Sequence, residues 1–216
     1  MSTLKNECTL PGSSGEHQMQ KTSGTQAKAK DFYMKQMLRY LPPSMQGFIT
    51  KQEMAFISTS DAKGECDSSF RSGEAGFMIV LDKTHLIYAE HKGNGVMASM
   101  GNIWENPHIG LLFLDFLEDK VGLHVNGKAS VIPNDLLAKH LDKSALKILE
   151  PIQKNLGNKH VSWVLIEVEE AYIHCSKNIP LFHKNLDSID LTKSRPIDYF
   201  KLQADKGLAN SLAEDK

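Results

Sequence analysis

Two apolar segments, residues 76–81 and 85–90, are separated by a connection that constrains the fold more than any other feature of this sequence. In GFMIVLDKTHLIYAE, only Asp82, Lys83 and Thr84 lie between them. Three residues are too few for the crossover helix that joins parallel strands, so the two segments must pair antiparallel. The sequence therefore predicts an antiparallel sheet rather than an alternating α/β fold.

The remaining apolar segments follow the same plan. Residues 53–70 comprise an apolar strand, a turn at 61–64 and a returning strand, which is the pattern of a hairpin. Residues 108–132 contain two more strands, joined across 118–120, and residues 161–177 form one long strand or a bent pair. Because the connections are short, this inventory predicts a mainly β fold, a β-barrel with peripheral helices.

Three helical segments are expected around the strands. One helix should begin behind an acidic N-cap at Asp31 and end before Pro42 and Pro43. A shorter helix follows over roughly 44–52. A third helix begins at Asn134, and its apolar face comprises Leu136, Leu137, His140, Leu141, Leu146 and Leu149.

The chain is organised as one domain between polar ends. Residues 1–30 are rich in Ser, Gly, Thr, Lys and Gln and hold few apolar residues, so burial cannot offset the entropy cost of ordering them. We expect a flexible N-terminal arm at 1–30, a barrel domain at 31–185 and a polar C-terminal segment at 186–216.

Charge and cysteine content narrow the partners and the compartment. The net charge of -1, with a pI of about 6.8, gives no molecular field that attracts nucleic acid or an anionic membrane. Cys8, Cys66 and Cys175 are odd in number and irregularly spaced, which indicates reduced thiols rather than disulfides. The N-terminus shows no secretory pattern, and no apolar run approaches the roughly 20 residues that span a bilayer. A soluble, cytoplasmic protein without nucleic-acid or membrane partners is expected.

The stretch from Leu86 to Asp115 has the order strand, glycine-rich turn, helix, strand, which is also the order of a dinucleotide-binding βαβ unit. Both of its strands, however, are halves of antiparallel hairpins, which argues against a doubly wound sheet. Asp115 is therefore expected to be an ordinary strand-end residue rather than a ribose ligand. No Lys-Ser/Thr pair follows the glycines, so the turn does not match a Walker phosphate loop either.

The turn at 93–95 leads into a helix whose free backbone N–H groups suit an anion in any fold. The neighbouring side chains that add hydrogen-bond donors are Lys92, Asn94, Ser99 and Asn102. Two interpretations stay open. The turn is either a phosphate site or a left-handed turn that starts a helix, with the polar residues as caps.

The segments AFISTSDAKGECDSSFRSGEAGFMIVLDKTHLIYAEHKGNGVMASMGNIWENPHIGLLFLDF and GLHVNGKASV resemble the FMN-binding split β-barrel proteins related to pyridoxamine 5'-phosphate oxidase. The shared motifs are a Ser/Arg strand end, GF opening a strand, GNG leading to a helix, and NP closing that helix. The resemblance is strongest over 55–131 and extends through WVLIEVEEAYIHCSKNIP. It implies a six-stranded antiparallel split barrel and a homodimer with FMN sites at the dimer interface.

The resemblance also implies the cofactor-binding residues. Arg71 and Ser72 match the strand end that meets the ribityl-phosphate, and arginine suits a bidentate phosphate contact. The alternative for Arg71 is an ion pair with Glu74 or another nearby carboxylate. The other residues at matching positions are Tyr88, Ala89, Glu90, Lys92, Asn94, Ser99, Asn102 and Lys177.

Departures from the family limit the function. Where pyridoxamine phosphate oxidases carry an Arg-x-Val-x-x-Lys strand, this chain has FRSGEAGF, and its end, ANSLAEDK, lacks their Arg-rich motifs. Vitamin B6 oxidation is therefore not expected. We expect an FMN-dependent oxidoreductase acting on a small molecule, and no catalytic side chain is assigned because the flavin itself supplies the chemistry. The alternative is a non-catalytic barrel that stores or senses flavin or haem.

Two other groups of residues have simpler interpretations. His174, Cys175 and His183 resemble metal ligands in composition but lack a zinc spacing, so no metal is expected. Phe77, Trp104 and Trp163 could cover a flavin, but aromatic residues in such positions are expected to be core.

Overall fold

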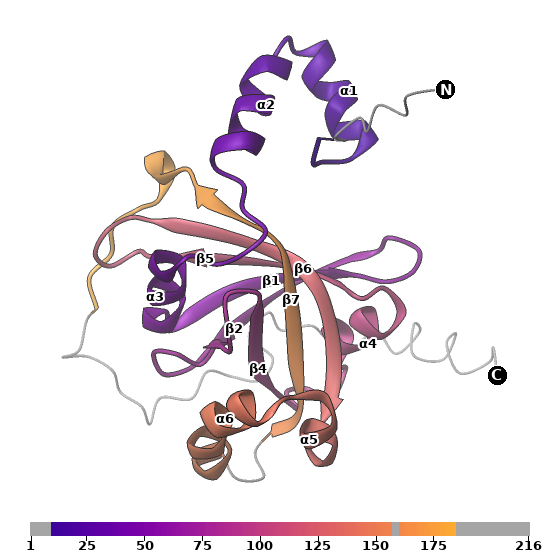
Figure 1. Ribbon diagram of the computed structural model, residues 1–216, viewed down its shortest axis with the longest axis vertical. Coiled ribbons are helices and arrows are strands. Elements are labelled where there is room, and N and C mark those ends of the chain that lie inside the picture. Colours follow the sequence, from indigo (N-terminus) through magenta and orange to yellow (C-terminus); the bar gives the residue numbers. More distant parts are fainter. Residues whose placement is uncertain (1–9, 157–159, 185–216) are drawn as a thin grey trace, which may run out of the picture. The chain divides into compact units, whose positions relative to one another are not determined.

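A curled antiparallel sheet of seven strands forms the centre of the fold in the computed structural model, which describes residues 10–156 and 160–184 (Figure 1). The strand order is β2-β1-β5-β6-β7-β4-β3, and all neighbours pair antiparallel. The predicted mainly β split barrel is confirmed, with seven strands in place of six. The strands are β1 (Met54–Ser60), β2 (Cys66–Ser72), β3 (Ile79–Val80), β4 (His85–His91), β5 (His108–Leu114), β6 (Gly122–Pro133) and β7 (His160–His174).

The three-residue connection between β3 and β4 forms the expected tight turn. Ile79 pairs with Ile87 across it. Within the turn, Asp82 Oδ1 accepts hydrogen bonds from the backbone N–H of Thr84 at 2.6 Å and from the Thr84 hydroxyl at 2.9 Å. The carboxylate therefore satisfies polar groups that the turn would otherwise leave to water.

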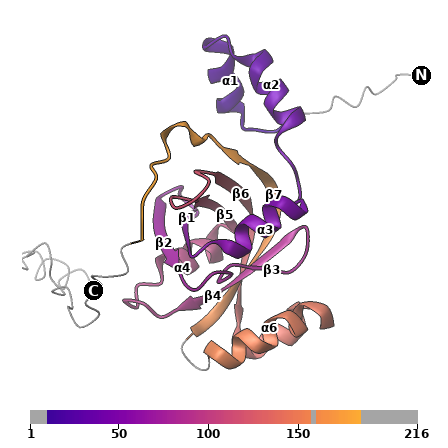
Figure 2. The same ribbon diagram turned by 90° about the vertical axis from the view of Figure 1, so that its left-hand side faces the viewer.

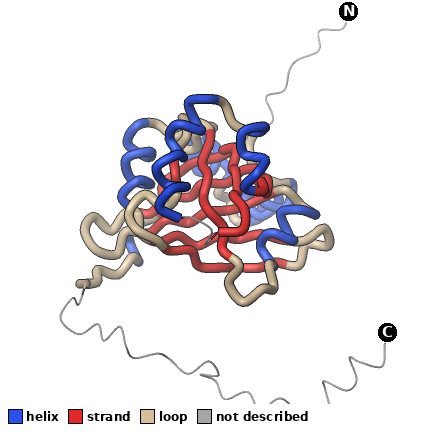
Figure 3. Tube along the Cα trace, turned by 90° about the horizontal axis from the view of Figure 1, so that it is seen from below, coloured by secondary structure: helices blue, strands red, loops and turns tan. Residues whose placement is uncertain are grey.

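One hydrophobic core lies inside the curled sheet. Along β1, buried residues such as Ala55 and Ile57 alternate with more exposed ones, as the two-residue period of a strand requires. Leu41, Ile49 and Ile103 belong to the same core and come from segments outside the sheet. Helices (blue) accordingly lie around the strands (red) in Figure 3.

A second core lies on the other face of the strands, between β4, β6 and β7 and the helical segment that follows β6. Ile87, Ile132 and Trp163 contribute from the strands, and Leu137 and Leu149 contribute from the helices. All five are at most 2% exposed. Figure 2 shows α6 (Lys143–Leu156) lying along this end of the strands. This helical segment therefore forms one wall of the space at the end of β4.

The helices agree with the sequence only in part. The short helix expected at 44–52 is confirmed as α3, but the helix expected from Asn134 is interrupted. Asp142 Oδ1 accepts a hydrogen bond from the backbone N–H of Ala145 at 2.8 Å, so the carboxylate starts a separate helix. The helices are α1 (Ser14–Thr22), α2 (Gln26–Lys35), α3 (Pro43–Lys51), α4 (Ala98–Glu105), α5 (Leu137–His140) and α6 (Lys143–Leu156), with 3-10 turns η1 (Asn134–Leu136) and η2 (Ser176–Asn178).

The N-terminal segment 1–30, expected to be a loose arm, contains α1 and half of α2, so part of it has regular structure that its composition did not predict. The Ser13 hydroxyl caps α1 by accepting from the backbone N–H of Glu16 at 3.1 Å. The two helices are held together by Tyr33, which is 7% exposed and hydrogen-bonded to Glu16 and Gln20. One buried aromatic residue thus supplies the packing that the composition of 1–30 lacks.

The helix expected to begin at Asp31 and run to the prolines begins instead at Gln26 and ends at Lys35. Beyond the end of this helix, Leu38 forms a bridge with Ala171 of β7. The backbone N of each residue donates to the carbonyl oxygen of the other, at 2.9 Å from Leu38 and 2.7 Å from Ala171. The expected C-terminal segment at 186–216 lies outside the described residues.

Candidate functional site

An ion pair joins strands that lie toward opposite ends of the sheet. Arg71 is in β2, the first strand of the sheet order, and Glu90 is in β4, beside the last strand. Glu90 Oε2 accepts hydrogen bonds from Arg71 Nε at 3.1 Å and from Nη2 at 2.8 Å. The two side chains are 20% and 8% exposed. The carboxylate partner that the sequence allowed for Arg71 is therefore Glu90.

Further contacts of the Arg71 guanidinium extend this ion pair into a network. Arg71 Nη1 donates to the Ser69 hydroxyl at 2.6 Å, and Nη2 lies 3.5 Å from the hydroxyl of Ser99, at the start of α4. The Ser99 hydroxyl in turn donates to Asp67 Oδ2 at 3.1 Å. The network thus holds one arginine between two carboxylates and ties α4 to β2.

The glycine-rich loop before α4 adopts the left-handed conformation that the sequence allowed. Gly93 and Gly95 have φ angles of 51° and 84°, and Met97, the N-cap residue of α4, has a φ of 58°. No side chain caps this helix, so its first N–H groups keep their capacity to donate. Lys92 and Asn94 are exposed on the same loop. The loop is therefore a left-handed turn that also presents anion-binding groups.

Two hollows adjoin at Arg71. The loop hollow, of about 550 Å³, is lined by the network and by residues 92–94 and 96–100, including Lys92, Asn94 and Ser99. The helix hollow, of about 390 Å³, lies between residues 71–77, strand β4 and the C-terminal end of α6. Arg71, Ser72 and His91 line both hollows.

The helix hollow is lined by two buried side chains whose polar atoms have no hydrogen-bond partner. Tyr88 is 1% exposed and Trp163 is fully buried, yet neither Tyr88 Oη nor Trp163 Nε1 has a partner. Burial, and then the charge of Glu90, raise the pKa of Tyr88 far above its ordinary value, while Arg71 acts in the opposite direction. The phenol is therefore a neutral donor at physiological pH.

Comparison with protein families matches residues 41–175, more than half of the chain, to pyridoxamine 5'-phosphate oxidase. The chain belongs to this family. A comparison with curated protein sequences found no match.

Several solved structures are similar to this chain in fold. HupZ from Group A Streptococcus is 20% identical, with 62% of this chain and 93% of HupZ covered and a TM-score of 0.47. A Lactobacillus delbrueckii protein named after pyridoxamine 5'-phosphate oxidase is 24% identical, with 63% and 98% covered and a TM-score of 0.45. HutZ, a haem storage protein of Vibrio cholerae, is 14% identical, with 62% and 94% covered and a TM-score of 0.40.

Eight of the ten residues expected to bind cofactor line one or both hollows: Arg71, Ser72, Tyr88, Ala89, Glu90, Lys92, Asn94 and Ser99. The other two lie elsewhere. Asn102 points to the sheet, where its amide donates to the Thr59 hydroxyl at 3.1 Å. Lys177 lies in η2 and lines neither hollow.

The sequence did not identify every residue at the hollows. Asp67 was missed because its position on β2 did not by itself indicate a role. Only the structure shows that Ser99, far away in the sequence, donates a hydrogen bond to it. Asn155 and Leu156 of α6 line the helix hollow and lie far from β4 in the sequence. Trp163 is core as expected, but Trp104 is 84% exposed on α4, so that expectation is wrong. Trp104 directly follows the buried Ile103, so it lies about 100° around the helix from the face that packs on the sheet.

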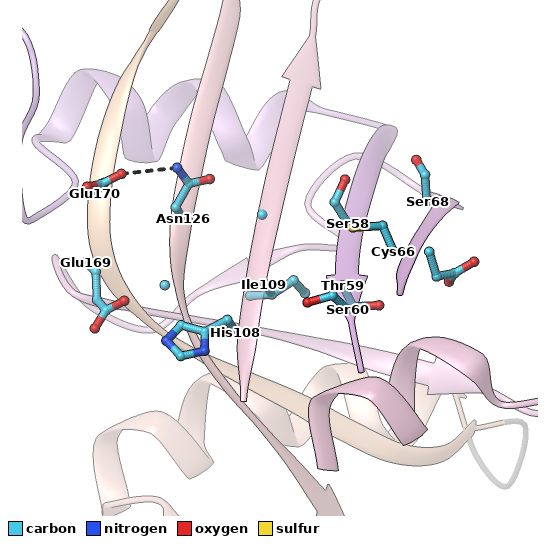
Figure 4. A pocket seen from close by; sticks show the side chains of 13 residues that line it. Ser58, Thr59, Ser60, Cys66, Ser68, His108, Ile109, Asn126, Glu169 and Glu170 are labelled. Atoms are coloured by element: carbon cyan, nitrogen blue, oxygen red, sulfur yellow. Dashed lines mark hydrogen bonds between the residues drawn. The ribbon is translucent and has the colours of Figure 1, made fainter. Parts of the chain in front are cut away.

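A third hollow lies across strands β2, β1, β5, β6 and β7 and is called the sheet hollow (Figure 4). Its volume is about 540 Å³, and serine side chains of β1 and β2 face the side chains of His108, Asn126 and Glu170 across it. The Asn126 amide donates to Glu170 Oε2 at 3.2 Å. This hollow is open to solvent, which suits contact with another surface rather than an enclosed ligand.

An apolar row runs beside the sheet hollow, along directly paired positions of the same strands. The row comprises Phe70, Phe56, Leu112, His124 and Tyr172. Phe70 is 52% exposed and Phe56 is 36% exposed. His124 stacks on Tyr172 with ring centroids 4.7 Å apart and contacts His174, with Nε2 and Nδ1 2.8 Å apart. Exposed aromatic residues in a continuous row are typical of an interaction surface.

Metal and membrane features were also sought in the described part of the chain. Residues 10–156 and 160–184 contain no group of three or more His, Cys, Asp or Glu arranged to hold a metal ion. Among the helices described, none combines the length and the apolar character needed to cross a membrane.

Proposed function

We propose that this protein binds FMN and catalyses the two-electron oxidation or reduction of a small molecule. The observation that supports this function is the meeting of the loop hollow and the helix hollow at Arg71, in a chain of the pyridoxamine 5'-phosphate oxidase family. One hollow offers anion-binding groups, and the walls of the other include Phe77, Ile79 and Ile152. Such a pair suits a ligand with a phosphate at one end and a flat ring system at the other.

The residues of the loop hollow fit a phosphate, provided that Arg71 is released from Glu90. Lys92 and the uncapped N-terminus of α4 supply positive charge and N–H donors. Arg71, however, is engaged by Glu90, and Asp67 lies on the other side of Ser99. A phosphate would therefore bind Arg71 in exchange for Glu90.

Bound FMN would supply the electron transfer, and the protein would bind and orient the flavin and control its surroundings. Ser72 and His91 lie between the two hollows, where the ring system would begin. The close packing of Gly73 on Phe77 brings the backbone of this loop near the site, because a Cβ atom at Gly73 would lie 2.6 Å from Phe77 Cβ.

Vitamin B6 oxidation is not the proposed reaction. A phosphorylated vitamin needs cationic side chains beside the ring. Among the described residues that line the helix hollow, Arg71 is the only lysine or arginine, and α6 contributes Ile152, Asn155 and Leu156. The proposed substrate therefore carries no phosphate.

The protein is also proposed to be a cytoplasmic homodimer that associates through the apolar row and the sheet hollow. Phe70 belongs to the row and also lines the loop hollow, so a second copy on this face would lie beside the cofactor site. Phe56→Lys is expected to convert a dimer to a monomer in light scattering and to weaken FMN binding. A dimer that persists in this variant would assign association to another surface.

The mass and absorbance of the molecule that copurifies with the protein test the cofactor. A yellow protein whose flavin bands are bleached by NAD(P)H, and restored by a substrate, would support the oxidoreductase. Bound flavin that no donor reduces would favour a flavin-binding module, and a haem spectrum would replace FMN by haem. A colourless protein that leaves FMN fluorescence unquenched would contradict the proposal.

A further inference from the structure

We propose that Asp67 is a specificity-determining residue of the loop hollow, where it limits the anionic end of the ligand to a single phosphate. The inference rests on the phosphate site of the proposed function and adds a limit to it. A ligand that continues beyond its first phosphate with a second one is excluded.

The side chains on one face of β2 change from a cation to a carboxylate along the loop hollow. Asp67, Ser69 and Arg71 are alternate residues of this strand, and all three are half-buried and line the loop hollow. Alternate residues project from the same face of a strand, about 6.6 Å apart. Of these three, only Arg71 also lines the helix hollow. A ligand that extends from the helix hollow along β2 therefore meets Arg71 first, Ser69 next and Asp67 last.

Asp67 is a carboxylate without an ion-pair partner in the described part of the chain. Its Oδ2 accepts a hydrogen bond from the Ser99 hydroxyl at 3.1 Å. Ser99 is the second residue of α4, so the carboxylate lies beside the N-terminus of this helix and shares its partial positive charge with any bound phosphate. Asp67 is therefore fixed by a neutral group and stays available to repel another anion, whereas Glu90 is paired with Arg71.

The charges that line the loop hollow suit one phosphate but not two. Among its described lining residues, the lysine and arginine are Lys92 and Arg71, and the carboxylates are Asp67 and Glu90. A first phosphate takes Arg71 from Glu90 and contacts Lys92. A second phosphate, farther from the helix hollow, would find no additional cation and would lie toward Asp67. Repulsion between like charges a few ångströms apart at a partly buried site changes an affinity by about ten-fold or more.

Three variants separate the charge of Asp67 from its contact with α4. Asp67→Asn removes the charge and keeps an oxygen that accepts from Ser99, and Asp67→Glu keeps the charge. Glu65→Gln is the matched control, because Glu65 is exposed, lies two residues before Asp67 and does not line the loop hollow.

The test compares inorganic phosphate with pyrophosphate on the full-length protein. The protein is labelled with ¹⁵N, and the backbone amide signals of Gly95 and Ser99 report binding of each anion. Wild type should bind pyrophosphate no more tightly than phosphate. Asp67→Asn should raise the pyrophosphate affinity by about ten-fold and the phosphate affinity by less than about three-fold, because the second phosphate lies nearer to Asp67. Asp67→Glu and Glu65→Gln should both behave as wild type.

The opposite results are equally clear. An equal gain for both anions in Asp67→Asn, or the same gain in Glu65→Gln, would overturn the proposal, because the effect would then be one of net charge. Loss of discrimination in Asp67→Glu would also overturn it, because the charge is retained there. If neither anion moves the two amide signals, the phosphate site of the proposed function fails together with this inference.

FMN and FAD extend the test to flavins, because they share a ring system and differ in the second phosphate and the adenosine that follows it. In isothermal titration calorimetry, wild type should prefer FMN by at least about ten-fold, and Asp67→Asn should reduce this preference by about five-fold or more. Equal affinity of wild type for both flavins, or a preference that Asp67→Asn leaves unchanged, would overturn the proposal. If FMN does not bind but Asp67→Asn still gains pyrophosphate affinity, the proposed cofactor fails and the role of Asp67 stands.

Discussion

Arg71 and Glu90 hold the two ends of the sheet together through a contact of 2.8 Å between Nη2 and Oε2. The pair is also the point at which the two hollows meet. Because Glu90 is nearly buried, the pair is costly to break from either side. Replacing Arg71 should therefore weaken ligand binding and replacing Glu90 should strengthen it. Either replacement should lower the free energy of unfolding.

Arg71→Ala should weaken FMN binding by about 1.5 to 3 kcal/mol, because a charge-assisted phosphate contact is lost. Fluorescence titration of FMN measures the change in dissociation constant. Arg39→Ala, at an exposed arginine outside both hollows, is the matched control and should leave the affinity unchanged. Equal affinity of wild type and Arg71→Ala would remove Arg71 from the cofactor site.

Glu90→Gln should tighten FMN binding by about ten-fold, because it releases Arg71 and removes a carboxylate that repels the phosphate. The same substitution should lower the free energy of unfolding of the ligand-free protein, since the ion pair is lost. Urea unfolding and FMN titration on the same sample measure both effects. Weaker FMN binding in Glu90→Gln would show that the carboxylate contacts the cofactor favourably.

Gly127 should not tolerate a side chain. The register of β6 against β7 shifts between Asn126 and Gly127, and a Cβ atom at Gly127 would lie 2.0 Å from the carbonyl oxygen of Glu167. Gly127→Ala should therefore lower the free energy of unfolding by about 3 kcal/mol. Gly101→Ala is the control, because this position in α4 has no atom within 4 Å and should gain about 0.5 to 1 kcal/mol.

The free energy of unfolding should decrease as the pH is lowered, in part because of His124. Burial, and then the neighbouring His174, lower the pKa of His124 below its ordinary value. The folded state thus favours the neutral ring, so this contribution is complete above the unfolded pKa of about 6.5 and is lost as the pH falls toward the folded pKa. Urea unfolding from pH 7.5 to 5 should show a smaller decrease for His124→Gln than for wild type.

The exposed His108 provides the comparison for that series. His108→Gln should retain the full pH dependence of wild type. If His124→Gln is as pH-dependent as wild type, another group causes the decrease. His160 would be the next to examine, because burial and then His91 lower its pKa in the same direction.

The sequence predicted the parts of this structure that depend on neighbours along the chain. The connection at 82–84 allowed only an antiparallel pair, and the glycines at 93 and 95 marked the left-handed loop before α4. Asp115 was expected to be an ordinary strand-end residue, but its carboxylate accepts from the backbone N–H groups of Leu117, Glu118 and Asp119 and so holds the β5–β6 turn. An aspartate just before a turn is the signal that could have predicted this role.

Features that depend on distant contacts could not be predicted in this way. Nothing local identifies Glu90 as the partner of Arg71, because the strands that carry them are not paired with each other. The wall that α6 gives to the helix hollow depends on how Leu149 packs against the sheet. The helices α1 and α2 depend on Tyr33, which lies beyond the polar segment that composition alone described.

The bridge between Leu38 and Ala171 has a consequence for the behaviour of shortened forms of the chain. At Ala171, β7 has already passed the end of β4, so Leu38 occupies backbone groups that would otherwise be an uncovered strand edge. Open edges recruit strands from other molecules. Removal of residues 1–40 should therefore leave a folded barrel that aggregates on concentration, with light scattering rising well before any loss of helix or strand content.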